Sequence, residues 1–264
     1  MPVRPLNTMN EYNLIRERSA MSMNIRRDLN ISGVLGGCSG GTFNKVTING
    51  HGTVNGDLDC IGFTCNGKTS VRGKVTAEII EVNGSASFGG EIRTGKLRIN
   101  GKSEMEGAVS ARNFRSDGHT KVGGDMTGEE VEINGSFKVN GNCDAERFRA
   151  RGTFRIDGLL NAETIDIDLY AECRAREIGG ESISVRKTGI DSPFGKLMKA
   201  LIFPKDALIA DTIEGDEVRL EYTTAGVVRG TNVTIGPGCH IGLVEYKDGY
   251  RRDIDAVVIE SRQM

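Results

Sequence analysis

The chain has 264 residues, and its 34 Lys and Arg against 36 Asp and Glu give a formal net charge of −2. This balance provides no strong attraction to nucleic acid or to an anionic membrane surface, so neither is predicted as a partner on charge alone. Glycine is abundant at 36 residues, tryptophan is absent and aromatic residues make up only 5%. Such a composition is unlike that of a thick globular core and is typical of a thin rod with many turns.

Residues 1–28 form the first segment, and we expect them to be an N-terminal tail. This segment contains both charge signs and lacks the apolar centre of a signal peptide. The sequence has no run of about 18 apolar residues that could cross a bilayer. The sequence therefore predicts a cytoplasmic protein.

From Leu29 the sequence repeats nine times with a 17-residue period. The fifth position of each copy is glycine, except in the ninth copy, where it is Leu169. A strict period of this length indicates a solenoid, in which each repeat stacks on its neighbours. The first position of every copy is a large apolar residue: Leu29, Val46, Phe63, Ile80, Leu97, Phe114, Val131, Phe148 and Ile165.

One copy, 131–147, shows how the chain runs within a repeat. Apolar or small residues alternate with polar ones, which predicts β-strands with one buried side. Asn-Gly pairs indicate turns, since glycine tolerates positive φ, and a small fifteenth residue such as Ala77 indicates a third corner. We therefore predict an all-β fold, a right-handed, three-faced parallel β-helix with nine regular 17-residue rungs over 29–185. Stacking at the usual strand spacing makes these rungs a rod about 43 Å long.

Metal, cofactor and enzyme functions are not predicted. The cysteines at inward positions, such as Cys60 and Cys143, are expected to be buried apolar residues, and no C-x-x-C pair is present. No G-x-x-x-x-G-K-S/T loop occurs for a nucleotide. A β-helical polysaccharide-cleaving enzyme would need clustered carboxylates beside a groove. The pairs Asp57 with Asp59 and Asp166 with Asp168 are the candidates, but the regular repeats carry no long loop to build a cleft.

Residues 186–206 interrupt the repeats, and here we predict a short helix behind Ser192-Pro193. One interpretation is a helix that packs on the side or end of the rod. The other is a contact with a membrane or a partner protein, because Lys196, Lys199 and Lys205 flank the apolar residues. The apolar residues at helical spacing are Phe194, Leu197, Met198, Leu201 and Ile202.

Strand-like alternation resumes in the last part of the chain. The alternation in residues 207–247, for example in the stretch 217–222, predicts two to four further, less regular β-helical rungs. We expect residues 248–264 to be a C-terminal tail, with a candidate strand at 256–259. The pattern also slips after Ile165, where Glu177 falls on an inward position of the 17-residue period.

The repeats resemble the bactofilins, which are bacterial polymer-forming cytoskeletal proteins. The resemblance is carried by stretches such as VEINGSFKVNGNCDAERFRARGTFRIDGLLNAE over about residues 29–181, and residues 211–246 look like the second half of longer Gram-positive relatives. It implies a right-handed, three-faced β-helix that assembles end to end without nucleotide. It also implies polymers that scaffold cell-envelope or cell-shape machinery, often at the membrane. The implied partners are other copies of the chain and membrane or envelope proteins, with no small-molecule substrate.

The ends of a β-helix favour polymerisation on physical grounds, because terminal rungs leave backbone groups unpaired and an apolar cross-section exposed. A head-to-tail contact that does not close produces a filament. The alternative is a binding module that does not polymerise, in which the terminal segments cap both ends. The predicted polymer interface consists of Leu29, Ile31 and Leu35 at one end and Ile241, Leu243, Val244 and Tyr246 at the other.

Overall fold

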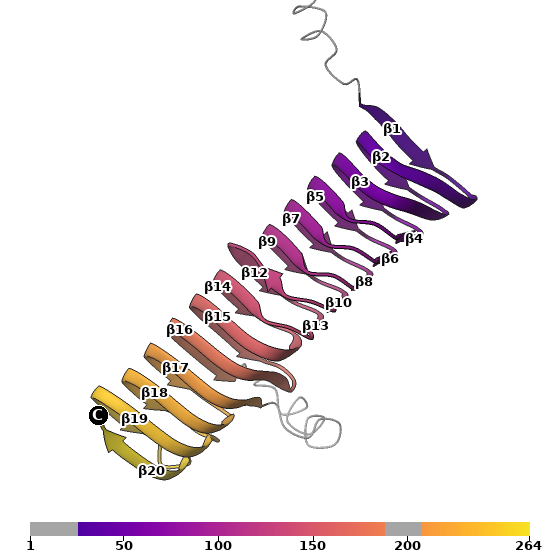
Figure 1. Cartoon of the computed structure of the whole chain (residues 1–264). Helices are drawn as coiled ribbons and strands as arrows, with labels where there is room; N and C mark the ends of the chain where they lie inside the picture. Colours follow the sequence, from indigo (N-terminus) through magenta and orange to yellow (C-terminus); the bar gives the residue numbers. More distant parts are fainter. Residues whose placement is uncertain (1–25, 188–206) are drawn as a thin grey trace, which may run out of the picture.

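The structure is a computed structural model that describes residues 26–187 and 207–264. The chain forms a straight rod in which each coil stacks on the previous one, from β1 at one end to β20 at the other (Figure 1). The strands pair in parallel throughout, from β1 with β2 to β19 with β20. The described residues make about 13 turns of a β-solenoid and contain no helix. The predicted parallel β-helix is confirmed.

The described strands are β1 (Arg27–Ile31), β2 (Val34–Ile48), β3 (His51–Cys65), β4 (Lys68–Val71), β5 (Val75–Val82), β6 (Ser85–Phe88), β7 (Ile92–Ile99), β8 (Lys102–Met105), β9 (Val109–Ser116), β10 (His119–Val122), β11 (Met126–Thr127), β12 (Glu130–Ile133), β13 (Ser136–Val139), β14 (Cys143–Ala150), β15 (Thr153–Leu169), β16 (Cys173–Lys187), β17 (Leu208–Leu220), β18 (Thr223–Ile235), β19 (His240–Arg252) and β20 (Val257–Gln263).

A regular turn has three faces, as the turn 68–84 illustrates. β4 forms the first face, and β5 forms the other two, with a corner at Glu78 and Ile79, where two consecutive side chains are exposed. The Asn83-Gly84 pair makes the next corner. Each residue pairs with its counterpart one period later, for example Lys68 with Ser85. We call such a set of residues, one from each turn, a column.

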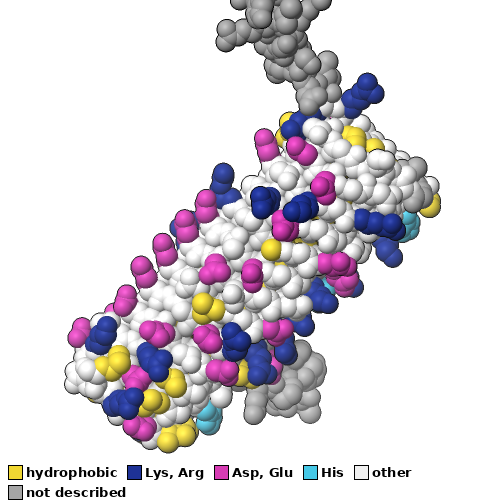
Figure 2. Space-filling view, viewed as in Figure 1, with side chains coloured by type: hydrophobic (Ala, Val, Ile, Leu, Met, Phe, Trp, Pro, Cys, Tyr) yellow, Lys and Arg dark blue, Asp and Glu magenta, His cyan; other side chains and the backbone are white. Residues whose placement is uncertain are grey.

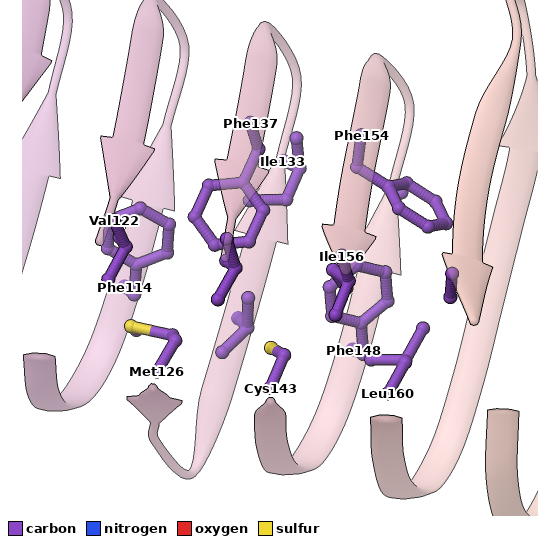
Figure 3. Packing of buried hydrophobic residues seen from close by; sticks show 14 of the residues in the cluster. Phe114, Val122, Met126, Ile133, Phe137, Cys143, Phe148, Phe154, Ile156 and Leu160 are labelled. Carbon is purple, nitrogen blue, oxygen red and sulfur yellow. The ribbon is translucent and has the colours of Figure 1, made fainter. Parts of the chain in front are cut away.

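The core consists of columns of inward side chains (Figure 3). Buried phenylalanines occupy three of these columns, and their rings contact one another in pairs. The ring centroids of Phe114 and Phe137 lie 5.3 Å apart, and those of Phe148 and Phe154 lie 5.4 Å apart with the rings edge to face. This geometry is favourable for aromatic pairs.

The sequence predicts that the corner residues are glycines because they adopt a positive φ, but the structure shows a different reason. Gly101 and its column have no positive φ, apart from Gly33 at 94°. Instead, a Cβ atom on Gly101 would lie 2.0 Å from the carbonyl oxygen of Gly84 in the preceding turn. The same contact recurs at Gly50, Gly67, Gly84, Gly118, Gly135 and Gly152. Close approach of the backbone in successive turns therefore excludes a side chain at this corner.

The asparagines before these glycines form a ladder of side-chain hydrogen bonds along the outside of the rod. The amide of Asn66 donates to Asn49 Oδ1 at 2.8 Å, Asn83 donates to Asn66 at 2.9 Å, and Asn100 donates to Asn83 at 2.6 Å. In the next turn Asp117 has no amide to donate, and it accepts instead from Asn134 at 2.8 Å. Such amide ladders form where identical residues stack at the strand spacing.

The slip in the pattern after Ile165 has a structural cause. Cys143 pairs with Leu160 in the regular register, but Leu160 pairs with Ile178, so this turn is one residue longer than a regular turn. The shift moves Glu177 off the predicted inward position, and its side chain is exposed opposite Leu159. A longer turn thus keeps the charged residue out of the core.

The C-terminal turns are shorter, and the last part of the chain is not a tail. Leu208 pairs with Thr223 and Ile213 with Val228, so the period in this part of the rod is shorter than in the regular turns. The predicted tail, 248–264, instead contains the end of β19 and all of β20. The exposed residues of β20 conceal its strand character, because only one side of this strand has a neighbouring turn among the described residues.

Candidate functional site: the two ends of the rod

The N-terminal end begins with a partial turn. β1 covers only the third face of the turn formed by β2, with Leu29 opposite Val46 and Ile31 opposite Ile48. Leu29 is half-buried and Ile31 is 3% exposed, while Val34 beside them is 86% exposed. Two of the predicted interface residues, Leu29 and Ile31, therefore lie in the first described turn. The third, Leu35, lies at the start of β2.

The predicted C-terminal interface needs a correction. Ile241 pairs with Val258, and Tyr246 pairs with Gln263, so β20 covers this part of β19. Ile241 and Val244 are buried, and Leu243 lies opposite Glu260. The predicted residues belong to the turn before the end, because the sequence pattern did not identify β20 as a further turn.

The C-terminal end is formed by β20 together with the last part of β19. β20 carries Val257 and Ile259, which are 51% and 83% exposed, and Ile254 before it is 94% exposed. Residues 249–252 of β19 form the third face, and no described strand pairs with their outer side. The candidate strand at 256–259 lies where β20 begins, but β20 extends to Gln263 and stacks on β19 as part of a further turn.

A column of alternating charge holds the last turns together. Glu245 lies between Arg229 of β18 and Arg262 of β20, and it accepts hydrogen bonds from both guanidinium groups. Arg229 also lies 3.8 Å from Glu214 of β17. The side chain of Glu245 is 7% exposed, and the hydrogen bonds from Arg229 and Arg262 lower the pKa of its carboxyl group. The last strand is thus joined to the rod by charge as well as by backbone pairing.

Two partly buried tyrosines pack against the core at the same end. The rings of Tyr246 and Tyr250 stack with their centroids 5.1 Å apart. Tyr246 occupies the column in which the preceding three turns have glycine, at Gly180, Gly215 and Gly230. Tyr250 stands in the column of Leu29 and the other first-position residues and has no described strand on its outer side.

Three of the four candidate catalytic carboxylates contact residues of other turns. Asp59 pairs with Arg26 at 3.0 Å, and Asp57 accepts a hydrogen bond from the backbone of Lys74 at 2.9 Å. Asp168 lies within reach of Arg151 and Arg186, at 3.5 and 3.2 Å. Charges of both signs are spread over the visible surface (Figure 2). Contacts of this kind stabilise the stacking of the turns.

The remaining titratable groups give no reactive centre in the described parts of the chain. Burial raises the pKa of the Cys60 thiol to about 11 and that of Cys173 to about 12, which disfavours the reactive thiolate. Within 26–187 and 207–264 there is no group of three or more His, Cys, Asp or Glu placed to hold a metal ion.

An open groove of about 620 Å³ follows one corner of the later turns. Gly180, Gly215 and Gly230 lie along it, with acidic side chains such as Glu181 and Asp216 beside them. This hollow arises because a corner without side chains is flanked by residues that have them.

The predicted membrane or partner contact at Phe194, Leu197, Met198, Leu201 and Ile202 lies outside the described residues. Among the residues that are described, no helix is long and apolar enough to span a bilayer.

Comparison with known proteins gives one family match and two relatives. The family model Bactofilin, described as polymer-forming cytoskeletal, matches residues 15–110. Uncharacterized protein YhbE of Bacillus subtilis (strain 168) is 59% identical over 232 residues, which is 87% of this chain and 95% of that protein. Uncharacterized protein YhbF of the same organism is 50% identical over 72 residues, a stretch that spans only 27% of either chain. No solved structure matches.

Proposed function

This chain belongs to the bactofilin family, and we propose that it is a cytoskeletal scaffold protein that polymerises end to end without nucleotide. The observation that carries the proposal is the state of the two ends. Each presents a strand edge that no described segment covers, together with apolar side chains such as Leu29 and Val257. Uncovered edges of this kind pair with further strands.

The rest of the rod supports a structural role. The family is a structural one, and the candidate carboxylates Asp59 and Asp168 form ion pairs with arginines of other turns. Buried cysteines with raised pKa values are inert apolar residues in this core. The finer proposal is that the polymer supports cell-envelope or cell-shape processes, with other copies of the chain as its main partner.

Electron microscopy of the purified protein without nucleotide, at low and high salt, tests polymerisation. We expect filaments from the wild-type chain and none from the double variant Leu29→Glu, Ile31→Glu, because both charges lie at the N-terminal cross-section. Ile79→Glu is the matched control, since Ile79 is 51% exposed at a corner in the middle of the rod. Uniform short rods from the wild-type chain would instead establish a binding module with capped ends. Filaments that survive the double variant would exclude this end as the contact.

The envelope role has a separate test. A fluorescent fusion in the native host should label the cell envelope, and deletion should change cell dimensions. For the proposed membrane or partner contact, the variant Leu197→Asp, Leu201→Asp should leave the membrane fraction while the wild-type chain stays in it. A variant that fractionates like the wild type would refute the contact.

A further inference from the structure

Five Asn-Gly pairs occupy the same corner in successive turns of the rod. In such a pair the backbone nitrogen of the glycine can attack the amide carbon of the asparagine side chain, because glycine has no Cβ to hinder the approach. The reaction requires that the glycine N–H and the asparagine amide are both free to move. The pairs are Asn49-Gly50, Asn66-Gly67, Asn83-Gly84, Asn100-Gly101 and Asn134-Gly135.

In four of the pairs, hydrogen bonds to the preceding turn hold both groups. The N–H of Gly84 donates to the carbonyl of Cys65 at 3.1 Å, and the amide nitrogen of Asn83 donates to Asn66 Oδ1 at 2.9 Å. An N–H that points at an acceptor in the next turn is not directed at its own neighbouring side chain. The same two bonds are made by Gly67 with Asn66, by Gly101 with Asn100 and by Gly135 with Asn134.

The first pair, Asn49-Gly50, lacks both constraints. Among the described residues the N–H of Gly50 has no acceptor, although the N–H of Asn49 donates to Ile31 at 2.8 Å. The exposed side chain of Asn49 accepts from Asn66, but its own amide nitrogen has no acceptor in the described part of the chain. The corner of the preceding turn explains the difference, because Ser32 stands there in place of an asparagine and the ladder ends at Asn49.

We propose that Asn49 is a site of spontaneous deamidation and that it reacts before the other four asparagines of this corner. The nitrogen of Gly50 forms a bond to Cγ of Asn49 and gives up its proton to the solvent. The bond from Cγ to the amide nitrogen breaks, and this nitrogen leaves as ammonia. Water then opens the cyclic imide at one of its two carbonyls, which produces aspartate or isoaspartate without any change of oxidation state. The reaction needs only water, and it does not depend on polymerisation.

The two products fit the corner differently. An aspartate keeps the oxygen that accepts from Asn66, as Asp117 does when it accepts from Asn134 at 2.8 Å. An isoaspartate lengthens the backbone by one carbon beside Gly50, where a Cβ atom would already lie 1.8 Å from the carbonyl oxygen of Gly33. Isoaspartate at this position should therefore loosen the stacking of the first two turns. Older molecules would then differ from new ones at this end of the rod.

Peptide mapping by mass spectrometry tests the site. The full chain is incubated at mildly alkaline pH, and the asparagine, aspartate and isoaspartate forms of each peptide are separated at successive times. A typical hydrogen bond disfavours opening by about a factor of five, so Asn49, with two bonds fewer, should react on the order of tenfold faster than Asn83. The comparison is restricted to this corner, because Asn55-Gly56 and Asn140-Gly141 stand in other columns.

The same chain unfolded in guanidinium chloride is the control for sequence effects, and in it the five pairs should react at similar rates. Equal rates in the folded chain would overturn the proposal. It would also be overturned if Asn49 led by the same factor in the unfolded chain, because the hydrogen bonds of the folded state would then have no part in the difference.

Two glutamine variants test the consequence for the corner. Glutamine forms the larger cyclic imide much more slowly, so Asn49→Gln blocks the reaction, and Asn100→Gln is the matched control at another exposed position of the ladder. Each variant is melted before and after incubation. The wild-type chain and Asn100→Gln should lose thermal stability during incubation, whereas Asn49→Gln should keep it. An equal loss in Asn49→Gln would refute the expected loosening of the first two turns.

Discussion

The regular turns up to β15 and the shorter turns of β17 and β18 belong to the same rod, but they differ in the length of their corners. A regular turn passes its corners with residue pairs such as Gly89-Gly90 and Asn83-Gly84. In the later turns each of these two corners is one residue shorter, which accounts for the shorter period. The corner within β5, at Glu78 and Ile79, keeps its length. Core width is thus compatible with either period, and the corners determine which one a turn adopts.

The two kinds of corner also differ in the side chains they allow. In the regular part, the column of Gly101 has no room for a Cβ atom. In the later part, Tyr222 stands at the equivalent corner with φ of 47°, and its ring lies 3.9 Å from the Lys187 ammonium group. The shorter corner therefore carries a side chain at the cost of an unusual backbone conformation. The strict 17-residue period in the sequence therefore indicates turns with glycine corners, and the turns with shorter corners do not follow it.

The largest expected effect comes from a side chain at the regular corner. Gly101→Ala places a Cβ atom 2.0 Å from the Gly84 carbonyl oxygen, so the two turns must separate. We expect a loss of about 4 kcal/mol in the free energy of unfolding, at the upper end for single substitutions. Chemical denaturation measures it. Gly62→Ala is the control, because its nearest neighbour would be Lys45 Cγ at 3.9 Å, and equal losses in both variants would refute the close-approach explanation.

The sequence predicted the regular part well because every turn repeats the same local conditions. The large residues of the Phe114 column and the Asn-Gly corners identified faces, period and stacking direction. It predicted a candidate strand at 256–259 but did not identify β20 as a further turn, since a terminal turn pairs on one side only and its residues, such as Ile259 and Arg262, need not alternate. The sequence also could not show why the corner residues are glycines. Close contact between turns and a positive φ both require glycine, so the sequence pattern is the same for either reason. The predicted interface residues Ile241 and Tyr246 lie one turn before the described end of the rod for the first of these reasons.

A smaller, pH-dependent effect is expected at the C-terminal end, where charge supplements the backbone pairing. The folded state lowers the pKa of Glu245 below the usual value of about 4.3. The stability that this charge provides is therefore present above the usual pKa and is lost as the pH falls through the lowered one. Glu245→Gln should melt at a lower temperature than the wild type at neutral pH, and the difference should shrink on acidification. Glu181→Gln, on an exposed corner, should show no such trend, and a constant difference for Glu245→Gln would contradict the ion-pair explanation.

Alanine substitution of two buried serines in the regular core should change the free energy of unfolding in opposite directions. Ser103 Oγ is buried with no hydrogen-bond partner, whereas Ser116 Oγ lies 2.8 Å from Thr120 Oγ1. Ser103→Ala removes an unsatisfied polar atom and should raise the free energy of unfolding by about 1 kcal/mol. Ser116→Ala leaves Thr120 unpaired and should lower it by a similar amount, about 1 kcal/mol. Chemical denaturation of both variants measures the difference, and equal signs would contradict this assignment of partners.

The smallest effect concerns the asparagine ladder, which the later turns lack. Asn83→Ala removes one amide that donates to Asn66 and accepts from Asn100, both on the exposed side of the corner. Water replaces part of the lost bonding, so we expect a loss of roughly 1 kcal/mol or less, measured by chemical denaturation. Asn83→Asp is the sharper variant, because the ladder already contains Asp117 at one step, where it accepts from Asn134 but donates to no neighbour. That variant keeps the acceptor for Asn100 and loses only the donor to Asn66, so it should lie between the wild type and Asn83→Ala. An aspartate variant less stable than the alanine variant would mean that charge at this corner, and not the amide ladder, governs its stability.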